Sequence, residues 1–405
     1  MRSEIFGNPA FTRFWLARGA SGFAYQMSAV AIGWQIYALT GDVFNLGLAG
    51  LMEFLPQFLL TLVVGHVADR VDRRIIVVVS QFTQCLLASL LAVGSVTQIL
   101  SLHGIFACIF LIGVARAFEM PSMQALLPEL VEADKLPQML AFAGSVFKFS
   151  VIAGPALGGF LYVAGPQVVY ITAAVVSLAG SICLAGIRKP KFASRRQPAT
   201  LRSVLGGIEY IRAHPDILGA ISLDLFAVLL GGATSLLPVY AKDILATGPW
   251  GLGILRAAPS VGALVMSLYL TRYTLKRNVG RIMFAAVAIF GIATVVFGLS
   301  RSLVVSVVAL VVLGASDMIS VVIRSTLVQL DTPDELRGRV SAVNAIFIGT
   351  SNQLGDFESG LMAAWLGAVP AVIVGGVGTL AVVALWMGFF PSLRRRDTLT
   401  AKTLS

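Results

Sequence analysis

The amino-acid sequence predicts an all-α polytopic membrane protein with about twelve transmembrane helices. Of its 405 residues, 57% are hydrophobic and only 12% are charged, and the mean hydropathy is +0.87. A water-soluble domain carries roughly a quarter charged residues, so a chain of this composition is expected to lie in lipid. Its apolar runs are ~20 residues or longer and lack the polar alternation of barrel strands. Because backbone groups in lipid must be hydrogen-bonded internally, the sequence predicts helices.

The hydropathy of the sequence predicts twelve spans along the chain. They are expected at residues 12–39, 43–67, 73–99, 103–127, 137–163, 167–187, 216–241, 249–271, 281–300, 302–329, 338–366 and 369–391. The first apolar stretch continues to about Leu39 and lacks a cleavable signal pattern, so it is predicted to be a first span and not a signal peptide.

Lysine and arginine are concentrated in alternate connections between the spans. The N-terminus, 68–74, 128–136, 188–215, 272–281, 331–339 and the C-terminal tail hold 23 of the 30 basic residues. The other connections hold only Lys242 and Arg301. Cytoplasmic loops carry this excess in membrane proteins, so both termini are predicted to be cytoplasmic, in a bacterial cell or inner (plasma) membrane. The net charge of +10 therefore belongs to loops, and we expect no nucleic-acid partner.

The longest polar stretch, 188–215, divides the chain into two predicted halves. It includes the amphipathic segment LRSVLGGIEYIRAHP and is expected to be a cytoplasmic linker with a surface helix; a partner-binding site is the alternative. The predicted organisation is a six-helix half at 1–187, this linker, a second six-helix half at 216–391 and a cytoplasmic tail at 392–405.

Weakly matching segments recur in the same order in both halves. With an offset of 206, NPAF at 8–11 falls on HPDI at 214–217, and Asn45-Leu-Gly falls on Gly251-Leu-Gly; with offsets of 200 to 201, LPELVEADKL at 127–136 falls on LVQLDTPDEL at 327–336, and Gly154 and Gly159 fall on Gly355 and Gly360. Two six-helix halves related by duplication are typical of secondary transporters, whose substrate sites lie near the membrane midplane.

The most specific local motif joins spans 2 and 3. It reads Gly65-His-Val-Ala-Asp69-Arg70-Val-Asp72-Arg73-Arg74 and resembles the motif of the major facilitator superfamily, which has a glycine, three residues, an aspartate, a basic residue and two closing basic residues. The family usually has glycine where this chain has Asp72. The resemblance implies a cytoplasmic gate, in which Gly65 permits close helix approach and Asp69 accepts hydrogen bonds from a neighbouring helix, by analogy span 11. On the alternative interpretation, the arginines only anchor the loop at the membrane surface.

Span 5 contains a second motif, Gly154-Pro155-Ala-Leu-Gly158-Gly159. It resembles the GPxxGG motif of antiporter branches of the superfamily, in which proline gives a kink or pivot and small residues let helices approach. Ordinary small-residue packing is the alternative. The segments ARAFEMPSMQALLPELV at 115–131 and TPDELRGRVSAVNAIF at 332–347 resemble the branch that contains the enterobactin exporter and the macrolide-efflux proteins.

Ionisable residues inside the spans are costly and are therefore candidate functional residues. For proton coupling, the sequence favours Glu53 and Glu119, with Asp317 and Asp356 as further candidates, because a buried carboxylate can load and release a proton near neutral pH. Arg116 and Glu119 are spaced i,i+3 on one face of span 4, so they can pair locally. Asp356 and Glu358 point ~200° apart on one helix and are expected to serve different targets. The candidates for ion pairs or the substrate cavity are Arg18, Arg116, Lys148, Asp224, Arg256, Arg324 and Glu358.

Other kinds of site are not indicated by the sequence. Cys85, Cys108 and Cys183 lie in apolar runs without a CxxC pattern, and no HExxH, GxSxG or Walker sequence is present. We therefore expect no enzyme activity, no metal and no cofactor, with the proton gradient as the energy source.

Together, the resemblance and the buried carboxylates predict a secondary active transporter. The predicted activity is proton-coupled antiport that exports small organic molecules of the drug, macrolide or siderophore class by alternating access. The expected partners are the small-molecule substrate and membrane lipid, and the chain is expected to act as a monomer. Two alternatives stay open: a uniporter or importer of a small metabolite on the same fold, and a membrane sensor or lipid-handling protein that does not pump.

Overall fold

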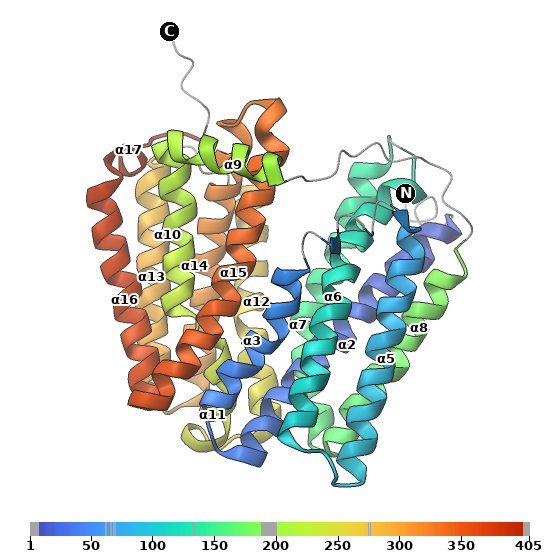
Figure 1. Ribbon diagram of the computed structural model, residues 1–405. Helices are drawn as coiled ribbons and strands as arrows, with labels where there is room; N and C mark the ends of the chain where they lie inside the picture. The colour runs from blue at the N-terminus through green and yellow to red at the C-terminus, as the bar shows by residue number, and fades with distance from the viewer. Residues whose placement is uncertain are drawn as a thin grey trace. The chain divides into compact units, whose positions relative to one another are not determined.

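The computed structural model consists of helices and connecting loops. It describes residues 8–60, 63, 64, 67, 70–132, 134–187, 201–273, 275 and 277–399. Within these residues, every regular element is a helix (Figure 1). The predicted all-α class is confirmed.

Each predicted span overlaps a helix of the described chain. These helices are α2 (Pro9–Thr40), α3 (Phe44–Leu59), α5 (Arg73–Val96), α6 (Leu102–Leu130), α7 (Leu136–Tyr162), α8 (Pro166–Ala185), α10 (Pro215–Gly231), α12 (Gly248–Arg272), α13 (Val279–Leu299), α14 (Leu303–Leu330), α15 (Asp334–Leu366) and α16 (Ala368–Phe389). Two further helices are α9 (Leu201–Ala213), within the predicted linker, and α17 (Pro391–Arg394), in the predicted tail. Among the described residues, nine helices are long and apolar enough to cross a membrane by length and composition. The count of twelve crossings stays a prediction.

The seventh predicted span, 216–241, is not one continuous helix. The extended backbone of Gly232 (φ −75°, ψ 97°) ends α10. The short segments that follow are η1 (Thr234–Leu236), α11 (Leu237–Val239) and η2 (Tyr240–Ile244). The predicted span agrees with the candidate membrane span Pro215–Ile244. Hydropathy measures composition, so it does not reveal this change in backbone geometry.

The helix α15 supplies hydrogen bonds to the backbone groups that this break releases. The Ser359 hydroxyl donates to the carbonyl oxygen of Gly232 at 2.5 Å, and the carboxylate of Asp356 accepts from the N–H of Ser235 at 3.1 Å. Unpaired backbone groups in lipid are costly, so the break requires these two side chains. Asp356 thus has a backbone-capping role in the structure.

One face of α5 shows how the helices meet lipid. Its exposed apolar side chains are Val79, Phe82, Leu86, Leu90 and Val93. Their spacing of three or four residues places them on one side of the helix. The polar Gln81 and Gln84 of the same helix are buried. A helix with apolar residues outside and polar residues inside is expected of a membrane bundle.

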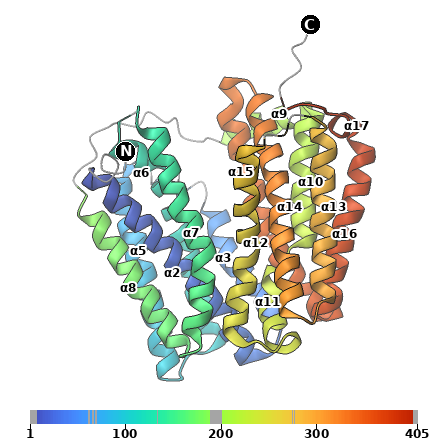
Figure 2. The ribbon, with the colours of Figure 1, turned by 180° about the vertical axis from the view of Figure 1, so that it is seen from behind.

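The chain divides into two compact units. The first unit comprises residues 1–41, 51–198 and 247–257, and the second comprises 42–50, 199–246 and 258–405. In the first unit, α2 packs against α7 and α8, and α5 packs against α6 and α8. In the second unit, α13 packs against α14 and α16, as Figures 1 and 2 both show, and α10 packs against α15 and α16. The beginning of α3 belongs to the second unit and the beginning of α12 to the first.

Matched glycines lie where α12 contacts the first unit and where α3 contacts the second. In the first unit, a Cβ atom on Gly159 of α7 would lie 2.9 Å from the Cα atom of Gly253 of α12. In the second unit, a Cβ atom on Gly47 of α3 would lie 2.9 Å from the Cα atom of Gly360 of α15. Gly47 and Gly253 are related by the offset of 206, and Gly159 and Gly360 by the offset of 201. The internal repeat is therefore a repeat of helix contacts as well as of sequence.

Candidate functional site

The first unit holds a polar cluster around Glu53 of α3. The hydroxyl of Tyr25 on α2 donates to Oε1 of Glu53 at 2.8 Å, and the guanidinium of Arg116 on α6 lies 3.6 Å from the centroid of the Tyr25 ring. Arg256, near the start of α12, donates to the carbonyl oxygen of Ala29 at 3.0 Å, and its charge also acts on Tyr25. A half-buried carboxylate is thus held by a neutral phenol, with two cations nearby.

A glycine on α6 brings the helices of this cluster together. A Cβ atom on Gly113 would lie 2.4 Å from the carbonyl oxygen of Glu53 and 2.7 Å from the ring of Pro56. The backbones of α3 and α6 therefore touch at Glu53, and a larger residue at this position would separate them.

A second carboxylate, Glu119 of α6, is almost completely buried, with 1% of its surface exposed. The side-chain amides of Gln81 and Gln84 on α5 donate to its two oxygens at 3.0 Å and 2.7 Å. Gln81 also donates to the carbonyl oxygen of Ala17 at 3.3 Å, whereas its own Oε1 atom has no hydrogen-bond partner among the described residues. The charge of Glu119 acts on Arg18 of α2.

The local pair that the spacing of Arg116 and Glu119 allows does not form between these two described residues. Both residues are described, and no ion pair joins them. Arg116 stacks on Tyr25, whereas Glu119 is hydrogen-bonded by α5. Residues three apart on a helix can meet, but here the neighbouring helices offer each side chain a different partner.

Arg18 is a candidate that the structure places against α7. Its Nε atom donates to the carbonyl oxygen of Ala143 at 3.0 Å, and its guanidinium lies 5.3 Å from the centroid of the Phe147 ring. Arg18 is therefore held by neutral groups.

The second unit contains a buried ion pair. Asp224 of α10 and Arg324 of α14 form a salt bridge, with side-chain exposures of 7% and 2%. The Ser320 hydroxyl donates to the other carboxylate oxygen at 3.4 Å. Of the three remaining candidates, Asp317 and Glu358 are partly buried and Lys148 is exposed.

The predicted gate motif is described only in part. Gly65 and Asp69 lie outside the described residues, and Arg70 is exposed. Asp72 forms the N-cap of α5, with its carboxylate accepting from the N–H of Arg74 at 2.9 Å. A carboxylate at a helix N-terminus is stabilising, which gives a local reason for aspartate where the family usually has glycine.

The two closing arginines of that motif have specific partners. Arg73 forms an ion pair with Glu129 of α6, and Arg74 donates to the carbonyl oxygen of Ile187 beyond the end of α8. They therefore connect helices of the first unit as well as supplying positive charge.

The glycines of the second predicted motif lie against other helices of the first unit. A Cβ atom on Gly154 would lie 2.6 Å from Cβ of Gln26, and one on Gly158 would lie 2.8 Å from Cα of Met27. Pro155 lies inside α7 without ending that helix. The motif thus lets α7 approach α2.

Sequence reasoning missed several residues of these clusters. Gln81, Gln84 and Glu129 were not candidates, and Tyr25 had no predicted hydrogen bond. The one signal that points to the two glutamines is their i,i+3 spacing in an otherwise apolar span, since a polar pair on one face of such a helix needs a partner. Within the described part of the chain, no group of three or more His, Cys, Asp or Glu side chains gathers as a metal site would require.

Comparison with known families gives one match along nearly the whole chain. The family described as "Transmembrane secretion effector" matches residues 5–403. Macrolide efflux protein A of Streptococcus pyogenes is 22% identical over 394 residues, covering 96% of this chain and 97% of that protein. The enterobactin exporter EntS of Escherichia coli (strain SMS-3-5 / SECEC) is 24% identical over 407 residues, covering 98% and 96%.

Solved structures with the same fold include transporters. A bacterial homologue of the iron transporter ferroportin, in an inward-facing state, aligns with a TM-score of 0.73 at 16% identity, covering 96% of this chain and 99% of that chain. A bacterial homologue of the human lysosomal transporter Spinster aligns with a TM-score of 0.73 at 12% identity, covering 95% of each. At these identities the likeness shows the fold alone.

Proposed function

Because the chain belongs to the transmembrane secretion effector family of the major facilitator superfamily, we propose that it exports small organic molecules in exchange for protons. It is a polytopic membrane transporter with relatives named for efflux. The proposed substrates are of the drug, macrolide or siderophore class, since one relative is a macrolide efflux protein and another an enterobactin exporter. The lysine and arginine distribution supports an inner-membrane orientation with both termini in the cytoplasm.

The observation that carries the proton-coupling proposal is the kind of partner that each buried carboxylate has. Glu53 is hydrogen-bonded by the phenol of Tyr25, and Glu119 by the amides of Gln81 and Gln84. None of these donors is charged. A carboxylate with neutral donors can take up a proton without stranding a buried counter-ion, which would be costly.

The unpartnered oxygen of Gln81 supports proton loading at Glu119. In the arrangement described above, the Gln81 amide donates to Glu119 while its Oε1 atom lacks a partner. Rotation of this amide by half a turn would present the oxygen to Glu119. A protonated Glu119 carboxyl group would then donate to that oxygen, so the same side chain serves both protonation states.

Protonation of Glu53 would act through Tyr25. The negative charge of Glu53 strengthens the hydrogen bond from Tyr25, and the Tyr25 ring carries the guanidinium of Arg116. Loss of that charge weakens the contact that joins α2, α3 and α6. For this to drive transport, protons must bind the inward- and outward-open states with different affinity.

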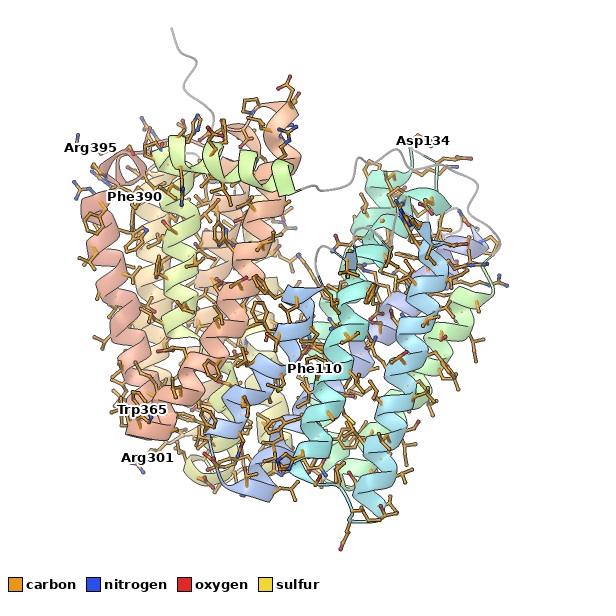
Figure 3. The ribbon with its side chains drawn as sticks, in the orientation of Figure 1. Phe110, Asp134, Arg301, Trp365, Phe390 and Arg395 are labelled. Atoms are coloured by element: carbon orange, nitrogen blue, oxygen red, sulfur yellow. The ribbon has the colours of Figure 1, made fainter. Side chains whose placement is uncertain are left out.

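The test is transport by the purified full-length chain in liposomes under an imposed pH gradient. With exchange of one proton for one neutral substrate, a gradient of one pH unit sustains up to about a tenfold substrate gradient. We expect radiolabelled erythromycin or enterobactin to accumulate only when the gradient is imposed. Glu53→Gln and Glu119→Gln are each expected to abolish this accumulation, whereas Asp134→Asn, a change in an exposed loop carboxylate (Figure 3), is expected to leave it intact.

Two results would contradict the proposal. Transport that proceeds unchanged without a pH gradient or membrane potential would indicate a uniporter. Uptake of substrate into whole cells, in place of its extrusion, would indicate an importer. The melting temperature of each variant separates a loss of coupling from a loss of folding.

A further inference from the structure

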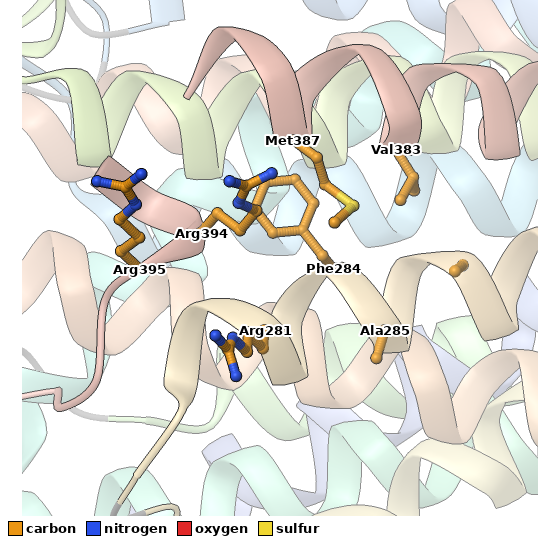
Figure 4. A pocket seen from close by; sticks show the side chains of 8 residues that line it. Arg281, Phe284, Ala285, Val383, Met387, Arg394 and Arg395 are labelled. Atoms are coloured by element: carbon orange, nitrogen blue, oxygen red, sulfur yellow. The ribbon is translucent and has the colours of Figure 1, made fainter. Parts of the chain in front are cut away.

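A pocket opens between α13 and α16 at one end of the second unit. It has a volume of about 520 Å³ and is lined by Arg281, Phe284, Ala285, Ala288, Val383, Met387, Arg394 and Arg395. Figure 4 shows the three arginines around one end of this space, with the ring of Phe284 and the side chain of Met387 beside them. Figure 3 labels Arg395 and Phe390 at the end of the unit opposite to Trp365 and Arg301. The pocket thus combines a basic rim at a helix end with an apolar floor.

The three arginines of the rim are available for an anion. No carboxylate lines the pocket, and in the part of the chain that the structure describes none of the three forms an ion pair. The adjacent Arg396 differs, because it binds the carboxylates of Asp216 and Asp331 at 2.7 to 3.1 Å. The consecutive arginines 394–396 are therefore divided. Arg396 forms ion pairs within the second unit, whereas Arg394 and Arg395 line the pocket.

The apolar floor continues along α13 as a track on its exposed face. Arg281, Ala285 and Ala288 are spaced by four and three residues, and the exposed Ile292 and Val296 continue the same spacing. Residues at this spacing lie above one another on a helix. From Arg281 to Ile292 the track is ~16 Å long at 1.5 Å per residue, which is close to half of the ~30 Å hydrocarbon core. Its length therefore fits an acyl chain of one leaflet.

We propose that this pocket binds an anionic phospholipid of the surrounding membrane, with its phosphate among Arg281, Arg394 and Arg395 and an acyl chain along the track. Planar guanidinium groups bind phosphate oxygens through paired hydrogen bonds. Basic pockets between transmembrane helices favour anionic head groups. A transported substrate is a poorer occupant, because the track lies on the exposed outer face of α13.

The experiment is native mass spectrometry of the purified full-length chain in detergent. The probes are palmitoyl-oleoyl phosphatidylglycerol, phosphatidylcholine with the same acyl chains, and inorganic phosphate. The phosphatidylglycerol is expected to bind at least about tenfold more tightly than the phosphatidylcholine, because three basic residues attract its negative head group. Excess inorganic phosphate is expected not to displace it, because phosphate lacks the acyl chains.

Two variants test the two parts of the site. Arg281→Gln, Arg394→Gln and Arg395→Gln combined are expected to remove the preference for phosphatidylglycerol. Ala285→Trp keeps the arginines but fills the floor, and it is expected to weaken both phospholipids. The charge-matched control combines Arg212→Gln, Arg272→Gln and Arg277→Gln, which change exposed arginines outside the pocket.

Three results would overturn the proposal. These are equal binding of the two phospholipids to the wild-type chain, an equal loss in the rim and control triple variants, and displacement of phosphatidylglycerol by phosphate alone. If the rim triple variant does not fold, Arg281→Gln and Arg395→Gln are made singly, since both side chains are exposed. The readout needs no transported substrate, so failure of this proposal is distinguishable from failure of the export proposal.

Discussion

The two units carry opposite charges at matching places. With the offset of 206, Arg18 of the first unit corresponds to Asp224 of the second. Gly113 of α6 lies against the carbonyl oxygen of Glu53 on α3, and Gly314 of α14 lies against the carbonyl oxygen of Pro259 on α12. Glu53 and Pro259 are themselves related by the offset of 206. Matching these glycines places Arg116 on Asp317. Duplication has thus kept the backbone contacts, whereas the charge at two of the matched positions is reversed.

The difference lies in how each unit satisfies its buried charges. In the first unit, the carboxylates of Glu53 and Glu119 accept hydrogen bonds from neutral side chains. In the second unit, Asp224 and Arg324 neutralise one another directly. Protonation of the first kind of carboxylate breaks no direct ion pair, whereas protonation of Asp224 would break its salt bridge with Arg324. Under the proposed proton coupling, this difference favours proton loading in the first unit and a structural role for the ion pair of the second.

The strongest test of this assignment removes one member of the buried pair. Asp224→Asn or Arg324→Gln alone leaves an uncompensated buried charge, which costs about 3–5 kcal/mol. We expect either single variant to lose most of its folded yield. The double variant is expected to recover much of that yield, as measured by size-exclusion chromatography and thermal melting in detergent.

Ser320→Ala is the matched control for the pair. It removes only the 3.4 Å hydrogen bond to Asp224, and its effect is expected to be within about 1 kcal/mol. If the double variant were no more stable than the single ones, the pair would have a role beyond mutual neutralisation.

The units also differ in how they hold the start of their first helix. In the first unit, the side chain of Asn8 caps α2 and donates to the carbonyl oxygen of Leu130 at 3.2 Å. In the second unit, Arg396 of the tail bridges Asp216 at the start of α10 and Asp331 at the end of α14. A neutral amide in one unit is replaced by an ionic bridge in the other.

Arg396→Gln is expected to destabilise the second unit by about 1.5–3 kcal/mol, the range for hydrogen bonds to charged groups. Burial lowers the pKa of Arg396, but its hydrogen bonds with Asp331 and Asp216 outweigh burial and raise the pKa above its ordinary value. A raised pKa gives stability that is fully present below the ordinary value, so the arginine itself loses none of it between about pH 6 and pH 9. Thermal melting across that range checks this, with Arg395→Gln as the control.

The bridge is reinforced by a second contact at the same helix end. The hydroxyl of Tyr210 on α9 donates to the carbonyl oxygen of Asp331 at 2.6 Å, and burial together with the charge of Asp331 raises the pKa of Tyr210. The phenol therefore stays protonated and remains a donor at neutral pH. A difference between wild type and Arg396→Gln that disappeared near neutral pH would contradict the ionic bridge.

The sequence was sufficient for the features that depend on solvent and composition. The spans follow from apolar length, and the buried charges stand out because charge is rare in lipid. The duplication was visible because glycines at contacts such as Gly159 cannot change freely. Each of these signals resides in the residue itself or in its regular spacing.

The sequence was not sufficient for the choice of partners. The spacing of Arg116 and Glu119 allows a local pair, but the guanidinium of Arg116 lies over the Tyr25 ring from α2, and only the packing of the helices decides this. Arg396 looks like any other basic residue of the charged loops, and its two carboxylate partners are distant in sequence. The break at Gly232 depends on side chains of α15 that stabilise the freed backbone, so local composition does not reveal it.

The prediction with the smallest expected effect tests whether the Gly159–Gly253 and Gly47–Gly360 contacts are equivalent. Gly253→Ala in the first unit and Gly47→Ala in the second each place a Cβ atom within 3.0 Å of a backbone atom of the facing helix, Pro155 O at 2.7 Å and Gly360 Cα at 2.9 Å. Overpacking of this kind costs about 1–3 kcal/mol, and we expect similar falls in melting temperature for both.

Gly144→Ala and Gly349→Ala are the controls, because a Cβ atom there meets nothing within 4 Å. Alanine in an open helical position stabilises by about 0.5–1 kcal/mol relative to glycine, so the controls should change in the opposite direction. If only one of the two contact variants were destabilised, the helix contacts would repeat in geometry but not in energy, and the correspondence between the units would apply to the backbone alone.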